Sequence, residues 1–365
     1  MGLTAGIIGL PNAGKSTIFN ALTSGSAAAE NYPFCTIEPN HGIAAIPDPR
    51  LEKITRCIPT GRVVPAFLEL VDIAGLVKGA SHGEGLGNQF LGHIREADAL
   101  LVVIRCFESS DVVHVDGEVN AVRDAEIIET ELIIKDLETV ERACSRITKA
   151  VQTGNKDLAV KARVLERLKD MLQQGVTARQ SIPDQEERKL VYDLHLLTVK
   201  PVLYCANTGD STPTHGEQRQ IDALNAHAGK TGAGFLPLRG KIESEIIQLS
   251  AEEREEYYRM LGLSESGLTG LAHALYRLLD LQTFFTVNEK ELHAWPIGIT
   301  GTALDAAGTV HSDFASGFVR ADVYNAADLE QLGSENALRA AGKIRSEGRE
   351  YKVRDGDILF FKATP

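Results

Sequence analysis

The stretch that decides the fold lies almost at the start of the chain and is Gly9-Leu10-Pro11-Asn12-Ala13-Gly14-Lys15-Ser16. It matches the pattern G-x-x-x-x-G-K-[ST], in which a glycine-rich loop joins a buried strand to a helix. Residues 4–8 before it are mostly apolar and partly β-branched, as in a strand, and residues 15–21 are typical of a helix start. The stretch therefore predicts a phosphate-binding loop, or P-loop.

The chemistry of this loop predicts which side chains meet a nucleoside triphosphate. Its glycines let successive backbone N–H groups point into one concavity, and the positive helix end adds to their attraction for phosphate. Lys15 is expected to reach the outer phosphates, and Ser16 is expected to offer its hydroxyl to Mg²⁺. The expected nucleotide contacts of the loop are Asn12, Ala13, Gly14, Lys15, Ser16 and Thr17.

Composition narrows the class of protein. The 365 residues suffice for two or three domains, and 43% hydrophobic with 24% charged residues is ordinary for soluble proteins. The five scattered cysteines form no C-x-x-C pair, which predicts neither a disulfide framework nor a zinc site. With no membrane-length apolar stretch and no leader, we expect a cytoplasmic protein without a membrane partner. The net charge of −12 argues against a strongly cationic nucleic-acid binder but leaves room for a local basic patch.

Short apolar segments alternate with helical ones through much of the chain. This alternation predicts an α/β fold, with a parallel sheet that carries helices on both faces. The strands expected from the sequence are Ala5–Gly9, Ala66–Asp72, Ala99–Arg105 and Pro201–Ala206.

The character of the chain changes between residues 125 and 197. Apolar residues there recur at helical spacing with charged residues between them, which predicts an antiparallel helical hairpin inserted between two strands. Two arrangements stay open: the hairpin protrudes, or its helices pack on the main core. The expected domains are residues 1–124 and 198–280 for the nucleotide-binding domain, 125–197 for the helical insertion and 281–365 for a C-terminal domain.

The last part of the chain predicts a small, separate domain of mixed α and β structure. Leu281–Val287 has the composition of a strand, and a helix interrupted by Gly308 and Gly317 is expected within residues 302–344. Residues 351–361 predict a β-hairpin, because Asp355-Gly356 is a strong turn signal.

Two further stretches predict how the site handles the γ-phosphate and its metal. Asp72 ends an apolar strand and can hold Mg²⁺ through water, and Gly75 can present its N–H to the γ-phosphate. Thr36 lies where a mobile loop could close its hydroxyl onto the same ion. These positions make Ser16, Thr36 and Asp72 the expected Mg²⁺ ligands, and Lys15, Thr36 and Gly75 candidate catalytic residues.

Taken together, these stretches resemble the Obg-like ATPase, or YchF-type, family of P-loop proteins, and the resemblance spans essentially the whole chain. It implies a nucleotide-binding domain, an inserted α-helical domain and a C-terminal TGS domain. Beyond the P-loop, the resemblance rests on residues 31–40, 72–81, 83–91, 105–108, 281–286, 311–314 and 351–357.

The choice of base depends on Asn207-Thr208-Gly209-Asp210. GTPases place Asn-Lys-x-Asp here, and the lysine is missing in this chain. The family's usual Asn-x-x-Glu goes with a preference for ATP, whereas this chain has Asp210 in place of the glutamate. Asn207 and Asp210 are the expected base contacts. ATP is favoured, and GTP stays open as the alternative.

The chemistry of hydrolysis predicts a slow enzyme. Leu76 occupies the position where Ras-like GTPases orient water with a glutamine, and its side chain cannot bond water. The resemblance implies His114 as a catalytic candidate. Asn12 offers a second route, because an asparagine in this type of P-loop can help to hold K⁺ beside the β- and γ-phosphates.

The resemblance also implies a ribosome or ribosomal RNA as partner of a mostly monomeric protein. The basic residues that could contact RNA phosphates in the C-terminal domain are Arg320, Lys343, Arg345, Arg349 and Lys352. Three functions stay open at this point: a slow ATPase switch that regulates translation or a stress response, a GTPase switch of the same architecture, and a non-catalytic adaptor that binds nucleotide.

Overall fold

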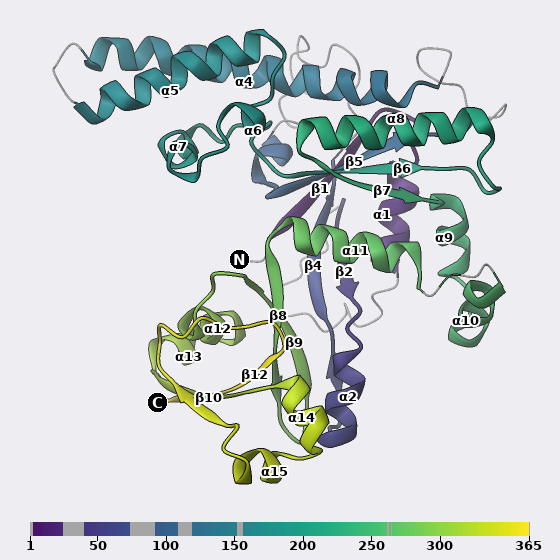
Figure 1. Ribbon diagram of the computed structural model, residues 1–365, viewed down its shortest axis with the longest axis vertical. Helices are drawn as coiled ribbons and strands as arrows, with labels where there is room; N and C mark the ends of the chain where they lie inside the picture. Colours follow the sequence, from purple (N-terminus) through teal and green to yellow (C-terminus); the bar gives the residue numbers. More distant parts are fainter. Residues whose placement is uncertain are drawn as a thin grey trace. The chain divides into compact units, whose positions relative to one another are not determined.

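A computed structural model describes residues 3–24, 40–73, 92–108, 119–151, 156–260, 263 and 265–364 of the chain (Figure 1). These residues divide into two compact units. The first unit contains the described residues within 1–24, 37–42 and 69–275, and the second contains those within 43–68 and 276–365. No helix in the described ranges is both long and apolar enough to cross a bilayer.

A six-stranded sheet with the order β2-β4-β1-β5-β6-β7 organises the first unit. The pairs of β4 with β1, β1 with β5, β5 with β6 and β6 with β7 are all parallel, which confirms the predicted α/β sheet. The four predicted strands are present, whereas β2 and β7 were not predicted. The strands are β1 (Thr4–Gly9), β2 (His41–Ile46), β4 (Ala66–Asp72), β5 (Ala99–Arg105), β6 (Val202–Asn207) and β7 (Gly234–Leu238).

One hydrophobic core joins this sheet to the helices that cover it. It contains Ile8 of β1, Val102 of β5, Tyr204 of β6 and Leu224 of a covering helix, all of which are buried. The helices of the first unit outside the insertion are α1 (Lys15–Ser24), α8 (His215–Thr231), α9 (Gly240–Ile246), α10 (Ala251–Met260) and α11 (Gly267–Leu278), the last of which runs into the second unit.

The helical insertion follows β5 and returns to β6. Ile128, in the first half of α4, belongs to the sheet core, whereas Val140 and Ile147 further along form a second core with Leu165 of α5. Both arrangements that the sequence left open therefore occur, in different halves of one helix. The elements are α4 (Ala121–Val151), α5 (Lys156–Gln173), α6 (Ala178–Ser181), α7 (Gln185–Leu190) and the 3₁₀ turn η3 (Tyr192–Leu194) (Figure 1).

A buried carboxylate fixes the return of the insertion toward β6. Asp136 of α4 accepts hydrogen bonds from the backbone N–H groups of Leu197 and Thr198, both at 2.8 Å, and from the Thr198 hydroxyl at 2.6 Å. Burial raises the pKa of Asp136, although these donors act in the opposite direction. The donors satisfy a group that would be costly to bury alone.

The second unit is built on a sheet with the order β11-β10-β12-β8-β9-β3. The predicted strand at Leu281–Val287 is present as β8. The other strands are β3 (Val63–Val64), β9 (Leu292–Gly298), β10 (Phe318–Asn325), β11 (Arg345–Glu347) and β12 (Asp357–Ala363). The helices are α2 (Arg50–Cys57), α12 (Ala303–Val310), α13 (Ser312–Ser316), α14 (Ala326–Leu332) and α15 (Glu335–Ala340).

Two expectations for this unit were wrong. The interrupted helix expected within residues 302–344 is present as separate helices, although α12 continues through Gly308. The helical assignment was wrong for Phe318–Asn325, which forms β10, since its buried Phe318, Ala321 and Val323 face the core of a sheet. The expected C-terminal hairpin is also absent from the described residues, because β12 pairs with β10 and β8. The predicted turn at Asp355-Gly356 is present, and Gly356 has a φ of 83°, in the left-handed region.

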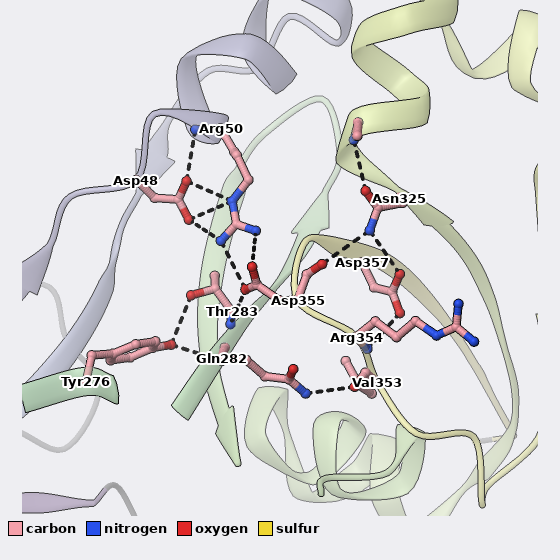
Figure 2. Close-up of polar contacts among 11 residues, drawn as sticks. Asp48, Arg50, Tyr276, Gln282, Thr283, Asn325, Val353, Arg354, Asp355 and Asp357 are labelled. Atoms are coloured by element: carbon pink, nitrogen blue, oxygen red, sulfur yellow. Dashed lines mark hydrogen bonds and ion pairs between the residues drawn. The ribbon is translucent and has the colours of Figure 1, made fainter. Parts of the chain in front are cut away.

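A polar network attaches Asp48 and Arg50, at the start of α2, to the C-terminal part of the second unit (Figure 2). The guanidinium of Arg50 donates to Asp48 and Asp355, each at 2.7 Å, and lies 5.1 Å from the ring centroid of Phe285. Asp355 also accepts the backbone N–H of Thr283 at 3.0 Å. These contacts explain why an N-terminal segment belongs to the C-terminal unit.

Candidate nucleotide-binding site

The P-loop joins β1 to α1 and needs two unusual backbone conformations. Asn12 has a φ of 64° and Gly14 a φ of 89°, both in the left-handed region. A Cβ atom on Gly14 would lie 2.1 Å from Nδ2 of Asn207, so no larger residue fits there. The loop is tightened further by a hydrogen bond of 3.3 Å from the N–H of Ala13 to the carbonyl of Leu10.

The register of two neighbouring strands brings the strand-end carboxylate to this loop. Asp72 of β4 pairs with Ile7 of β1, which lies just before the P-loop. The Asp72 carboxylate accepts a short hydrogen bond from Nζ of Lys15 and one of 3.2 Å from the hydroxyl of Ser16. The side chains of Lys15 and Asp72 are each only 12% exposed. Thr17 lies exposed in the first turn of α1.

These side chains suit a hard divalent cation. The Ser16 hydroxyl and the Asp72 carboxylate place two oxygen atoms 3.2 Å apart beside the P-loop. Mg²⁺ is commonly held in this way by one or two protein oxygens, with phosphates and water completing its shell. Elsewhere in the described ranges no cluster of three or more His, Cys, Asp or Glu residues could hold a metal. The donor set therefore fits Mg²⁺ supplied with a nucleotide.

Asn207 connects the P-loop to a second loop. Its Nδ2 donates to the Ala13 carbonyl at 2.9 Å, and its Oδ1 accepts from the Gly240 N–H at 3.1 Å. The residue is 5% exposed, and a Cβ atom on Gly240 would lie 2.8 Å from the Asn207 Oδ1 atom. Asn207 thus positions the loops around the site, a role that the sequence did not indicate. Its contact with the base stays a prediction.

Asp210 is paired within the protein. Its Oδ2 lies 2.8 Å from Nζ of Lys241, and the two side chains are 49% and 67% exposed. This ion pair joins the loop after β6 to the first turn of α9. In the same loop, the N–H of Thr208 donates a hydrogen bond of 2.8 Å to the carbonyl of Leu238, at the end of β7. No local pattern indicated the pairing, because the two residues are 31 positions apart.

Three of the predicted site residues lie outside the described part of the chain. Thr36, Gly75 and His114 fall within residues 25–39, 74–91 and 109–118. Their predicted roles toward the metal, the γ-phosphate and the attacking water therefore stay predictions. Leu76 lies in the same undescribed stretch as Gly75.

The basic residues expected to contact RNA in the C-terminal domain mostly make contacts within it. Lys343 lies 3.0 Å from Asp328, and Arg345 donates to the hydroxyl of Tyr351 at 2.9 Å. Arg349 and Lys352 donate to backbone carbonyls at 3.1 and 2.7 Å, whereas Arg320 is exposed. Four of the five cations are thus held by their own unit.

A parallel sheet whose first strand leads into a P-loop, with a strand-end aspartate against its lysine and serine, defines a P-loop nucleotide-binding protein. Two family models match the chain. Residues 4–136 match the "50S ribosome-binding GTPase" model. Residues 281–364 match the YchF-GTPase_C model, which is described as "Protein of unknown function (DUF933)".

Relatives along the whole length name the family. The "Ribosome-binding ATPase YchF" of Escherichia coli O157:H7 is 44% identical over 361 residues, which cover 99% of both chains. The protein of the same name from Bacillus subtilis is 44% identical over 363 residues, again covering 99% of both. The solved structure of the Schizosaccharomyces pombe YchF GTPase superposes with a TM-score of 0.87 at 34% identity, covering 99% of this chain and 97% of that one. The chain belongs to the YchF family.

Proposed function

We propose that this protein binds ATP with Mg²⁺ at its P-loop, hydrolyses it slowly to ADP and phosphate, and associates with ribosomes as a switch that regulates translation or a stress response. The observation that carries the proposal is the meeting of Lys15, Ser16 and Asp72 at one point of the P-loop. The whole-length relatives named "Ribosome-binding ATPase" support the choice of ATP and of the partner.

The residues of the site have distinct parts in this proposal. Lys15 places its ammonium group at the outer phosphates, and the P-loop N–H groups hold the phosphate oxygens. Ser16, Asp72 and Thr36 hold Mg²⁺, which when bound neutralises charge that develops on the phosphates. Gly75 presents its N–H to the γ-phosphate. His114 is the candidate to orient the attacking water.

The ion pair between Asp210 and Lys241 supports ATP over GTP. A guanine ring is recognised when an aspartate at this position accepts its N1 and exocyclic amine protons. Here one oxygen of Asp210 already lies 2.8 Å from a lysine ammonium, so guanine would have to compete with that ammonium. Competition between ATP and GTP for the nucleotide-free protein tests this directly, and tighter binding of GTP would identify a GTPase switch instead.

K⁺ is proposed as an activating ion near Asn12. Asn12 is exposed in the P-loop and has a φ of 64°, in the left-handed region. A monovalent cation there would supply part of the positive charge that an arginine provides in faster enzymes. Hydrolysis should be faster in KCl than in NaCl, and equal rates in the two salts would refute the proposal.

The deciding experiment compares Lys15→Ala with Lys230→Ala. Lys230 is an exposed lysine in the last turn of α8, so its loss controls for the removal of one positive charge. ATP hydrolysis and nucleotide-dependent sedimentation with ribosomes should both be lost in Lys15→Ala and retained in Lys230→Ala. If Lys15→Ala and the wild type sediment with ribosomes equally, both in ATP and in ADP, ribosome binding does not depend on the nucleotide. The protein would then be an adaptor rather than a switch.

A further inference from the structure

The chain that leaves β5 is held in shape by one of its own arginines. Arg105, at the end of β5, is only 3% exposed, and its Nε donates to the Phe107 carbonyl at 3.0 Å. Its Cζ lies 4.7 Å from the centroid of the Phe107 ring, and Asp124, a buried residue of α4, supplies an opposite charge. Residues 105–108, here called the support segment, are therefore firmly placed at the edge of the sheet where β1 leads into the P-loop.

The loop with the two predicted base contacts, residues 207–210, rests on the support segment and is called the base loop below. The N–H of Cys106 donates to the Asn207 carbonyl at 2.9 Å. A Cβ atom on Gly209 would lie 3.4 Å from the Cβ of Phe107, which is ordinary van der Waals contact. The support segment thus contacts both the start and the middle of the base loop.

One carboxylate ties the support segment to the helix that follows the base loop. Oε2 of Glu217, in the first turn of α8, accepts the N–H of Thr214 at 2.8 Å and so caps the helix. Oε1 accepts the N–H of Glu108 at 3.1 Å, although the two residues are 109 positions apart. The same oxygen would lie 3.8 Å from a Cβ atom on Gly209. Glu217 therefore contacts both the base loop and the segment that supports it.

The bond from Glu108 to Glu217 is not needed for the helix cap. Glu253 of α10 accepts the N–H of Ser250 at 2.9 Å in the same kind of cap, and its carboxylate has no further partner among the described residues. Burial acts to raise the pKa of Glu217, but the N–H groups of Thr214 and Glu108 outweigh it and hold this pKa below its ordinary value. The carboxylate is thus charged at neutral pH, which strengthens both bonds.

We infer that Glu217 is a positioning residue for nucleotide binding, which holds the base loop ready for the purine without touching the nucleotide. A loop that is already in place binds more tightly, because less ordering is left to occur on binding. The inference rests on the proposed function, which places the base against Asn207 and Asp210. The P-loop does not depend on Glu217, because the Asn207 side chain ties it to Gly240.

The test is ligand binding by Glu217→Gln, measured by isothermal titration calorimetry with ADP and with pyrophosphate, both in Mg²⁺. Glutamine keeps the volume of the side chain but has one accepting oxygen for two N–H groups. ADP should bind about three- to tenfold more weakly, as expected for the loss of one hydrogen bond, whereas pyrophosphate, which has no base, should bind as before. KM for ATP should rise by the same factor at unchanged kcat, because KM reports binding when chemistry is slow.

The matched control is Glu253→Gln, which alters a helix cap of the same kind but no contact of the base loop. Equal ADP affinities of Glu217→Gln and Glu253→Gln would overturn the inference. An equal loss of ADP and pyrophosphate binding would also overturn it, since Glu217 would then support the fold as a whole, and so would a lower kcat at unchanged KM. Wild-type protein that binds ADP no more tightly than pyrophosphate would show that the base loop contributes nothing, which likewise overturns it.

The same measurements separate this inference from the proposed function. Absence of ATP hydrolysis by the wild-type protein would refute the proposed function. The titrations with ADP and pyrophosphate would still decide the role of Glu217, because they require binding and no turnover.

Discussion

The amide of Asn207 offers a sharp test of how the P-loop is held. Asn207→Ala removes two hydrogen bonds, one of 2.9 Å to the Ala13 carbonyl and one of 3.1 Å from the Gly240 N–H. Each is worth about 1 kcal/mol, and leaving the buried partners unpaired adds to the cost, for a total of about 2–3 kcal/mol. Hydrogen–deuterium exchange should therefore be about 30- to 150-fold faster in peptides that span the P-loop and the start of α9.

The variant Asn207→Asp separates this tether from simple loss of volume. It keeps an oxygen for the Gly240 N–H but puts a second oxygen in the place of Nδ2, which lies 2.9 Å from the Ala13 carbonyl oxygen. Two acceptors then face each other and a charge is buried, so its effect should be at least as large as that of Asn207→Ala. The control is Asn225→Ala, an exposed residue of α8. Exchange at wild-type rates in Asn207→Asp would refute the reasoning.

Three further predictions concern stability. Arg50→Leu should cost about 2 kcal/mol of the second unit's stability, because Asp48, whose side chain is only 9% exposed, loses its partner at 2.7 Å. Urea unfolding followed by Trp295 fluorescence measures this cost, and an equal effect of Arg56→Leu, which breaks an exposed ion pair, would contradict it. The hydrogen bond from His227 to Glu129 raises the pKa of His227 above 6.5, so the stability it contributes is present at low pH and lost as pH rises through the raised pKa. Tm should therefore fall as the pH rises above about 6.5, and this fall should be smaller in His227→Gln. Asp136→Asn turns an N–H₂ group toward the backbone N–H groups of Leu197 and Thr198, which are themselves donors. Tm should therefore fall by several degrees in thermal unfolding. An unchanged Tm would mean that these hydrogen bonds are not needed for stability.

The sequence by itself determined the class of this protein and most of its local elements. The P-loop pattern fixes a strand, a loop and a helix in order, because its glycines and lysine suit only that local geometry. Apolar runs predicted β1, β4, β5, β6 and β8, since a buried strand leaves a clear pattern. Periodicity likewise predicted the paired helices α4 and α5. β10 was missed because only some of its residues face the core and an adjoining glycine resembles a helix break.

The tertiary structure alone decided which distant residues meet. Asp72 reaches Lys15 because β4 and β1 pair in one particular parallel register, and a shift of one residue would turn its side chain to the other face. The contact of Asn207 with Gly240, the attachment of Arg50 to Asp355 and the bond from Glu108 to Glu217 depend in the same way on packing between segments far apart in the chain. Local patterns specify local conformation, whereas these contacts are set by how strands and helices pack together.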